Sequence, residues 1–448
     1  MAETGEQDER ARRNRRSRLD RTRRDRPADL PRHRGRQRPQ PGPTGPIVKL
    51  EDFAAESEEW LASHAELKPQ RGRFHWGDGD DGIVEIWSEH DPTVDAEHLR
   101  SSRAWRQLRF DAGYGWIDGP LELGGRGLTP SHARAFARLE SRYDVPPQDW
   151  FKLGPVIGPI LMAHASEELQ ERYVPGLHRG DLVACELFSE PGAGSDLSSA
   201  SCSAVAAGND WVLDGQKVWT SDAHIADIGL VLARTDRELS ANRGLTTFLI
   251  DMTDPAVEVR PLRQMTGGSA FNEVFITDLR VPDGHRVGAV NGGWAVAVHT
   301  LMFERQLVAA GHGRGGVGIA NGDRLTELVR HFGGGDDTVI RQRLARVIGD
   351  FRVAGYLNQR RDLPSDALIM AKLSLARNLT SAAGLVAEVL GPPITADTGE
   401  WGTFAWTKFL LGAPGNHIAV GTDETIKNII GERILGLPRE PRPAAETP

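Results

Sequence analysis

The segment ACELFSEPGAGSDLSS occupies residues 184–199 and decides the fold of this 448-residue sequence. Its first half predicts a β-strand, and the strand runs directly into a glycine-rich turn. Gly192 and Gly194 carry no side chain, so the backbone N–H groups of the turn can approach a ligand closely. Ser189 and Ser195 add hydroxyl donors beside them. Taken alone, the segment predicts a tight turn with some affinity for an anion.

A second segment, GQKVWTSDAHIADIGLVLART, follows at residues 215–235. It alternates apolar and polar residues and predicts strands, with Trp219 and Ser221 at a strand edge. A tryptophan in such a strand is, by itself, more often a core residue than a cofactor contact.

The predicted secondary structure changes twice along the chain, from helices to strands and back to helices. Residues 48–182 are predicted to be mostly helical, beginning with IVKLEDFAAESEEWLASHA, where Phe53, Trp60 and Leu61 recur at helical spacing. Gly124, Gly125 and Gly127 mark a tight turn between helices, and Thr129 is the expected N-cap behind it.

Residues 183–288 contain short strands, among them WVLDGQKVWTS and FNEVFITDLRVP. From residue 289 to 438 the pattern is helical again, with four apolar-periodic segments that predict a bundle. We therefore expect a helical domain (48–182), a β domain (183–288) and a helical bundle (289–438), preceded by an arm (1–47) and followed by a tail (439–448).

The composition is that of a folded chain without a membrane span. Hydrophobic residues make up 39% of the sequence, and no apolar run approaches transmembrane length. The N-terminus is charged and lacks the apolar core of a signal peptide. Cys185 and Cys202 are the only cysteines, which favours a reducing, cytoplasmic location without disulfides. The histidines show no metal-ligand spacing, and no P-loop or nucleophile elbow appears.

The arm, residues 1–47, carries fourteen Arg against seven acidic residues, about +7, whereas the whole chain carries −8. It has almost nothing to bury and is expected to be disordered. It could bind nucleic acid or a membrane surface, be a solvated tail, or result from a start codon placed too early. The last two interpretations are favoured because acids are interspersed among the arginines and no aromatics accompany them.

Together, in this order and spacing, the two segments closely resemble the flavin-binding signatures of the acyl-CoA dehydrogenases, and the resemblance extends over residues 48–438. It is supported by WIDGPLELGGRG (116–127), FLIDM (248–252), NEVFITDLRVP (272–282) and GTDETIKNIIGERILGLPRE (421–440). It implies an α+β, acyl-CoA dehydrogenase-like fold with an N-terminal helical domain, a middle β-barrel-like domain and a C-terminal four-helix bundle. It also implies FAD as the cofactor and an acyl-CoA as the substrate.

The same resemblance implies roles for individual residues. Ser189 would donate to the N1/O2 edge of the flavin, Trp219 would cover the face away from the substrate, and Ser221 would bond near N5. Thr422 would cap a helix whose N-terminus lies near the cofactor. The residues implied for FAD are Glu186, Phe188, Ser189, Gly194, Ser195, Trp219, Thr220, Ser221, Arg330, Thr422 and Glu424. Those implied for the substrate are Ser195, Arg305 and Gly421.

The catalytic base is not at the position most common in the family. Many members carry a Glu immediately before the Gly-Thr of the last motif, but here the segment is HIAVGTDET, and Val420 cannot accept a proton. In LMFERQLVAAG, however, Glu304 shares a helical face with a mostly apolar set: Ala297, Thr300, Leu301, Leu307, Val308 and Gly311. Burial there is expected to raise its pKa toward the range useful to a base. A subset of the family, including isovaleryl-CoA dehydrogenases, carries its base at this position. Alternatively, Glu304 pairs with an Arg and only holds the bundle together; Arg305 is open to the same structural interpretation.

Two further segments depart from the family pattern. The family's Arg-x-x-Phe-Gly is only roughly echoed by ELVRHFGG, where Arg330 stands one residue too close to Phe332. The family's Gln-x-x-Gly-Gly appears as EVLGPP at residues 388–393. The departures leave open whether the cross-subunit contacts to FAD are intact. They resemble a bacterial, actinomycete-type branch, some members of which are paired subunits acting on bulky CoA thioesters of fatty acid or steroid catabolism.

Four functions stay open at this point. The favoured one is a catalytic dehydrogenase that uses Glu304, with electron-transfer flavoprotein as the expected acceptor and a homo- or hetero-oligomeric state. The others are a complementing subunit of a heteromer, a flavin oxidase or other member of the superfamily, and a nucleic-acid-binding relative, which is the least expected. The pair Glu304 and Val420 separates the first two, and flavin absorbance of the protein expressed alone is the simplest test.

Overall fold

The computed structural model describes residues 48–69, 74–79, 84, 86–87, 92–309, 322–360 and 369–439. The predictions for the arm and for most of the tail lie outside these residues, as do the side chains of Leu307 and Val308 and the whole of Gly311. The described residues from Leu50 onward belong to one compact unit. The proposed domain boundaries remain predictions.

The first part of the chain is helical, as expected. It contains α2 (Leu50–His64), α3 (Pro92–Asp111), α4 (Pro130–Glu140), α5 (Gly154–His164) and α6 (Glu167–Arg179), with short 3-10 turns at Leu121–Leu123 and Asp149–Phe151. Phe53 and Leu61 of α2 are fully buried. Thr129 is the N-cap of α4, as predicted. The turn before it needs glycine: Gly124 has a φ of 85°, and a Cβ there would lie 2.7 Å from the Phe110 ring.

The middle part forms one eight-stranded sheet. Its strands are β1 (Ala184–Leu187), β2 (Ser203–Ala207), β3 (Asp210–Ser221), β4 (Ile228–Arg234), β5 (Leu245–Asp251), β6 (Val257–Leu262), β7 (Phe271–Pro282) and β8 (Arg286–Val287). The order is β6-β7-β3-β2-β4-β5-β8, and β1 pairs parallel with β4. Among the described residues the sheet does not close, so it is an open relative of the barrel implied by the resemblance.

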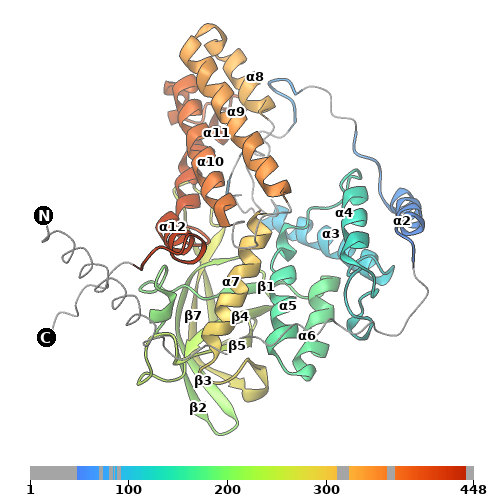
Figure 1. The fold of residues 1–448 in the computed structure, drawn as a ribbon, viewed down its shortest axis with the longest axis vertical. Helices are drawn as coiled ribbons and strands as arrows, with labels where there is room; N and C mark the ends of the chain where they lie inside the picture. Colours follow the sequence, from blue (N-terminus) through green and yellow to red (C-terminus); the bar gives the residue numbers. More distant parts are fainter. Residues whose placement is uncertain are drawn as a thin grey trace, which may run out of the picture. The chain divides into compact units, whose positions relative to one another are not determined.

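The two faces of this sheet belong to different cores. On one face, side chains of β1, β4 and β5 pack against α5, α6 and α7 (Gly293–Ala309), which lie over the sheet in Figure 1. On the other face, residues of β1 to β7 pack together with Trp150 and Phe151. Alternate residues of β1, β4 and β5 therefore point to opposite cores.

The last part is helical, with more elements than the sequence predicted. After α7 come α8 (Asp323–His331), α9 (Thr338–Gln359), α10 (Ile369–Leu390), α11 (Thr403–Gly412) and α12 (Asp423–Ile429), followed by a π-helical turn at Ile430–Ile434. The sequence analysis missed α8 and α11, which are short. It also did not foresee the π-helical turn that follows α12.

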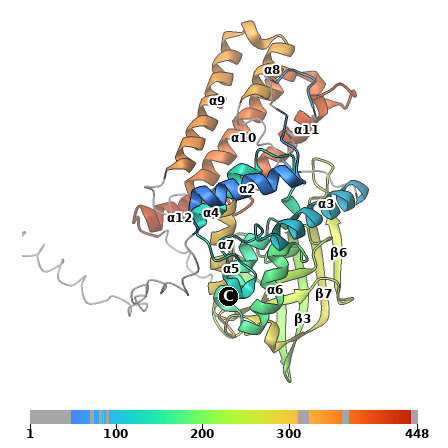
Figure 2. The same ribbon diagram turned by 90° about the vertical axis from the view of Figure 1, so that its right-hand side faces the viewer.

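The core of these helices includes a segment from the first part of the chain. Val84 and Ile86 are buried beside Leu328, Leu379 and Trp406, and Trp87 donates from Nε1 to the carbonyl of Gly412 at 3.0 Å. Figure 2 shows α8 to α11 together, with α12 at the lower end of the group. Within the described part of the chain, no helix is both long and apolar enough to cross a membrane.

Candidate functional site

The turn after β1 is closed by its own backbone. Glu190 N–H donates to the Ala193 carbonyl at 3.1 Å, and Ala193 N–H donates back to the Glu190 carbonyl at 3.0 Å. A Cβ on Gly192 or Gly194 would meet no atom within 4 Å, so the space beside the turn is open. The tight turn that the sequence predicted is thus present and is open at its two glycines, while its role toward a ligand remains a prediction.

A buried ion pair fastens this turn to β3. The side chain of Lys217 is 0% exposed, and its Nζ donates to Glu190 Oε1 at 2.8 Å, to the Phe188 carbonyl at 3.1 Å and to the Leu232 carbonyl at 2.6 Å. Burial opposes the ionisation of Glu190, but Lys217 outweighs it and the pKa of Glu190 is lowered. Val218 N–H also donates to the Ser189 carbonyl at 2.9 Å. The two segments singled out in the sequence are therefore adjacent.

The end of β3 is strained and irregular. The pairing of β3 with β7 shifts register between Lys217 and Thr220, and the intervening Trp219 has a φ of 62°. The left-handed region is unfavourable for a bulky residue and marks strain that the surrounding fold must hold. Asp222 is also left-handed, with a φ of 59°, and its carboxylate lies 2.6 Å from Lys152 Nζ.

This bulge turns Trp219 outward. Its side chain is 60% exposed and meets Phe271 edge-on, with ring centroids 6.0 Å apart. The exposure rules out the interpretation of Trp219 as a core residue. Thr220 beside it is buried, whereas Ser221 is half-buried at the end of the strand. An indole that is held in an exposed position can stack against a flat ligand.

The remaining residues of the turn differ in exposure. Phe188 is buried in the core under α7, Ser189 is half-buried, and Gly194 and Ser195 are exposed. Phe188 can therefore only support the turn through its side chain, while the other three are accessible to a ligand.

Glu186 lies on the side of β1 that faces α7. Its strand neighbours Ala184 and Phe188 belong to the core beneath α7, whereas Cys185 and Leu187 point into the opposite core. Burial and the negative charge of Glu304 raise the pKa of Glu186 well above its usual range. The fold thus brings two carboxyl groups together that are far apart in the sequence.

Arg305 lies beside Glu304 and close to the last motif. A Cβ placed on Gly421 would be 4.0 Å from Arg305 Nη2. Burial lowers the pKa of Arg305, the carboxylate of Glu304 raises it, and Arg433 lowers it. The Nε of Arg305 is buried and has no hydrogen-bond partner in the part of the chain that the structure describes. A buried donor of this kind is costly unless a ligand supplies the acceptor.

The backbone is strained at Val420, the position where many members of the family carry the base. Val420 has a φ of 59° and Gly421 a φ of 91°, so two successive residues are left-handed. A β-branched residue in this region is a genuine outlier. Thr422 ends the strained turn by capping α12, with its Oγ1 accepting from Thr425 N–H at 3.2 Å, as the sequence predicted.

A cluster that the sequence analysis did not find holds this turn against α10. Asp423 accepts from Lys372 Nζ at 2.8 Å and lies 2.8 Å from His417 Nδ1, while His417 Nε2 lies 2.7 Å from Thr380 Oγ1. Burial opposes ionisation of Asp423, but Lys372 and His417 outweigh it and lower its pKa. The acidic residue in the GTDET motif was the one available signal for this role.

Two expected residues lie apart from this arrangement. Glu424 is 78% exposed and only 3.9 Å from Lys427, an (i, i+3) neighbour. Arg330 pairs with Glu327 at 2.6 Å on α8, at the opposite end of the helices from α12 in Figures 1 and 2. The structure does not bring Arg330 near Glu304 or Trp219 within this chain. Its role toward FAD remains a prediction.

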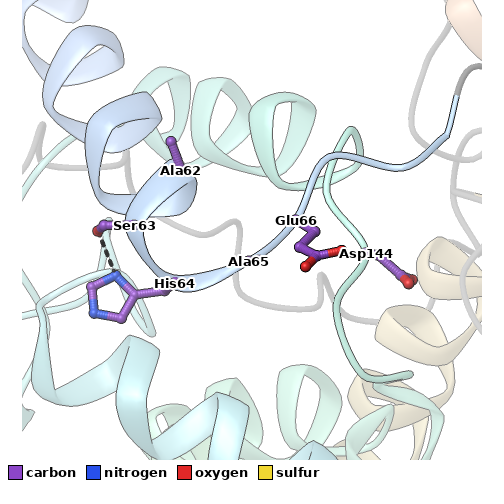
Figure 3. Close-up of a pocket in the computed structure, with 6 residues that line it drawn as sticks. All are labelled: Ala62, Ser63, His64, Ala65, Glu66 and Asp144. Atoms are coloured by element: carbon purple, nitrogen blue, oxygen red, sulfur yellow. Dashed lines mark hydrogen bonds between the residues drawn. The ribbon is translucent and has the colours of Figure 1, made fainter.

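A separate hollow of about 450 Å³ lies at the end of α2 (Figure 3). It is lined by Ala62, Ser63, His64, Ala65, Glu66 and Asp144. Ser63 and His64 bond to each other at 2.9 Å, and none of the residues expected to bind FAD or substrate lines it. Among the described residues no group of three or more His, Cys, Asp or Glu is placed to hold a metal ion.

Comparison with known proteins agrees with the fold. Residues 185–279 match the model of the acyl-CoA dehydrogenase middle domain, and residues 291–435 match that of the acyl-CoA dehydrogenase C-terminal domain. The chain is 34% identical over 398 residues to acyl-CoA dehydrogenase IpdE1 of Mycobacterium tuberculosis, covering 87% of this chain and 98% of that protein. It belongs to the acyl-CoA dehydrogenase family, whose members are oxidoreductases.

Solved structures show the same fold. The Tcur3481-Tcur3483 steroid ACAD has a TM-score of 0.66 at 23% identity, with 87% of this chain and 98% of the other covered. The ChsE4-ChsE5 complex from Mycobacterium tuberculosis has a TM-score of 0.60 at 23% identity, with 87% and 98% covered. At this level of identity, they establish the fold alone.

Proposed function

We propose that this chain catalyses the FAD-dependent α,β-dehydrogenation of an acyl-CoA thioester, with Glu304 as the base that takes the Cα proton. The observation that carries the proposal is the position of Glu304 on α7, which lies near the α7-facing carboxyl group of Glu186 and next to the half-buried Arg305. Members of the family carry the base at one of two positions. In this chain the first position is Val420, which cannot accept a proton, and the second is Glu304, which can.

The residues of the site fit FAD. Trp219 offers an exposed ring, the open turn at Gly192 and Gly194 offers backbone donors, and Ser189 and Ser221 offer hydroxyl groups on adjacent segments. When bound, FAD supplies the acceptor for the hydride that leaves Cβ. The hydroxyl of Ser189 would stabilise negative charge at the N1/O2 edge.

The side chains on α7 act on the substrate end. Glu304 would remove the Cα proton, and Arg305 would supply its unpartnered Nε–H to an acceptor near the thioester. Ser195, which is exposed at the end of the turn, would contact the pantetheine. Gly421 lies beside the guanidinium of Arg305, and its φ of 91° is one that glycine adopts readily.

The substrate we propose is a bulky CoA thioester, such as one with a steroid side chain, with electron-transfer flavoprotein as the acceptor. The support for a bulky substrate is the similarity of fold to the Tcur3481-Tcur3483 steroid ACAD. A second protomer of this chain, or a related chain, would complete the distal half of the FAD site and provide an oligomer.

A second candidate function is that of a complementing subunit in a heteromeric dehydrogenase. Two observations favour it: the base position of the last motif is a valine, and Arg330 is engaged by Glu327. The similarity to a two-chain complex, ChsE4-ChsE5, also supports it.

Anaerobic bleaching of the flavin tests the two candidates. The full chain, purified alone and with any genome-neighbour homologue, is mixed with a panel of CoA thioesters from short acyl to steroid side chain. Bleaching by the chain alone supports the first candidate. Flavin that is bound but is bleached by no substrate supports the second, and a preparation without flavin absorbance under all conditions contradicts both.

A further inference from the structure

We propose that Glu186 and Glu304 form a hydrogen-bonded carboxyl–carboxylate pair, in which neutral Glu186 donates to ionised Glu304 and positions it as the base. Glu186 is therefore a positioning residue that acts through Glu304. The catalytic consequence rests on the proposed function, whereas the existence of the pair does not.

The first step of the argument is the direction of Glu186. Side chains alternate along a strand, and Ala184 and Phe188 both lie in the core beneath α7. Glu186 stands between them, opposite Leu230 of β4, which belongs to the same core. Its carboxyl group therefore projects toward α7 instead of into the interior on the other side of the sheet.

The second step is the face of α7. Val296 and Ala297 are buried against the sheet, Thr300 is fully buried one turn later, and Leu301 packs on the same core. Glu304 follows Thr300 by four residues and Ala297 by seven, which places it on the same face of the helix. Glu186 and Glu304 thus lie on facing sides of the contact between helix and sheet, near enough for the charge of Glu304 to act on Glu186.

The third step is the charge around the pair. Among the described residues, four other titratable groups act on the pair or on its neighbours. Arg305 lies next to Glu304 on α7, and Arg433, in the π-helical turn after α12, acts on Arg305. On the sheet side, Glu186 and Asp222 both act on Cys185. Arg305 is directed toward Gly421, where Arg433 also acts on it. Burial and the like charge of Glu304 together raise the pKa of Glu186. Two adjacent carboxyl groups under these conditions cannot both ionise cheaply, so one keeps its proton.

The two carboxyl groups therefore have different roles in the reaction. Glu186 keeps the proton and orients the Glu304 carboxylate by a charge-assisted hydrogen bond. In the reaction the Cα–H bond breaks and an O–H bond forms on Glu304, while the electron pair stays with the substrate and forms the new double bond as the Cβ hydride departs. Glu186 neither gains nor loses its proton in this step.

The pair can be observed without turnover, by infrared spectroscopy of the full-length protein across a pH series. A protonated carboxyl group has a carbonyl band above amide I, and the wild type should keep one such band at neutral pH, where exposed carboxyl groups are ionised. The band should be absent in Glu186→Gln. It should persist in Glu304→Gln but titrate at lower pH, because the partner charge is gone. Glu171→Gln, an exposed residue of α6, is the matched control and should retain the wild-type band.

A wild type without the band at neutral pH, or a band that neither variant alters, overturns the pair. If Glu186→Gln does not fold, the pH shift in Glu304→Gln decides alone. A wild type that has the band but bleaches with no CoA thioester contradicts the proposed function and leaves the pair standing.

Kinetics then test positioning. Gln can still donate a hydrogen bond, so Glu186→Gln should stay within about tenfold of the wild-type rate, whereas Glu186→Leu should lose about 100-fold or more in kcat. On the alkaline side the wild-type rate should fall as Glu186 ionises, and that of Glu186→Gln should not. Equal losses in Glu186→Gln and Glu186→Leu, with no change in the pH profile, would show a packing role only.

Discussion

Lys217 and Glu190 form an ion pair inside the protein, with Nζ 2.8 Å from Oε1 and side chains only 0% and 5% exposed. The second oxygen of Glu190 accepts from the backbone and the hydroxyl of Ser201, at 2.7 and 2.8 Å. The pair connects the glycine-rich turn to the strand that carries Trp219, so the two halves of the candidate flavin site are held together by one fully satisfied polar cluster.

Replacing Lys217 by Met should therefore destabilise the fold strongly. It leaves a buried carboxylate without its counter-charge, which costs about 3–5 kcal/mol. Urea unfolding of the full chain measures the loss, and flavin content should fall with it. Arg260→Met removes a member of an exposed pair with Glu258 and should leave the free energy of unfolding nearly unchanged. Equal effects of the two variants would contradict the role of Lys217.

Replacing Trp219 should separate ligand binding from folding. The side chain is largely exposed and its backbone is left-handed, so Trp219→Gly removes strain and should leave the melting temperature unchanged or raised. Flavin retention should fall by about tenfold or more, since the ring contact is lost. Val205→Ala, at an exposed position of β2, is the control for loss of an exposed apolar group. Flavin retention equal to that of the wild type would show that Trp219 does not contact the cofactor.

Glu304→Gln should keep flavin while losing activity by several orders of magnitude, because the amide has a similar size but cannot take the Cα proton. The measurement is the rate of anaerobic bleaching with the best CoA thioester, and Glu171→Gln is the control. Val420→Glu in the Glu304→Gln background would restore some turnover if a substrate fits beside it. Equal bleaching rates in wild type and Glu304→Gln would show that Glu304 is not the base.

The stability of the protein should depend on Glu186 at neutral and alkaline pH. Its pKa is raised in the folded state, so the folded protein holds a proton that the unfolded chain releases. Its contribution is therefore fully present below the ordinary pKa of a glutamate and is lost as pH rises toward the folded value. Glu186→Gln removes this dependence, and its melting temperature relative to wild type should rise over the range from about pH 5 upward. A constant difference across that range would contradict the raised pKa.

Removal of residues 1–45, to begin at Pro46, should leave the melting temperature and activity unchanged. The arm contains almost no apolar side chains to bury, as its sequence shows. A drop of several degrees would refute this, and DNA binding that is salt-sensitive and confined to the full-length form would support the nucleic-acid interpretation.

Local features of the fold could be predicted from the sequence. The turn after β1, the strands of the middle part and the N-caps Thr129 and Thr422 follow from residue types at fixed short spacings. The short helices α8 and α11 were missed because 9 and 10 residues, fewer than three turns each, give too little periodicity. The segment around Val84 could not be placed, since its partners lie hundreds of residues away.

By itself the sequence determined the order of helical, β and helical parts, the flavin-binding signatures and the valine at the position of the common base. These depend on local residue patterns and on motif order. Only the tertiary structure decided that Trp219 is exposed, that Lys217 holds Glu190, and that Glu186 faces Glu304. The first two relationships depend on how β3 pairs with β7 and packs on the turn after β1, and the third depends on how a strand packs against a helix over a hundred residues away. No periodicity within either element encodes which side chains then meet.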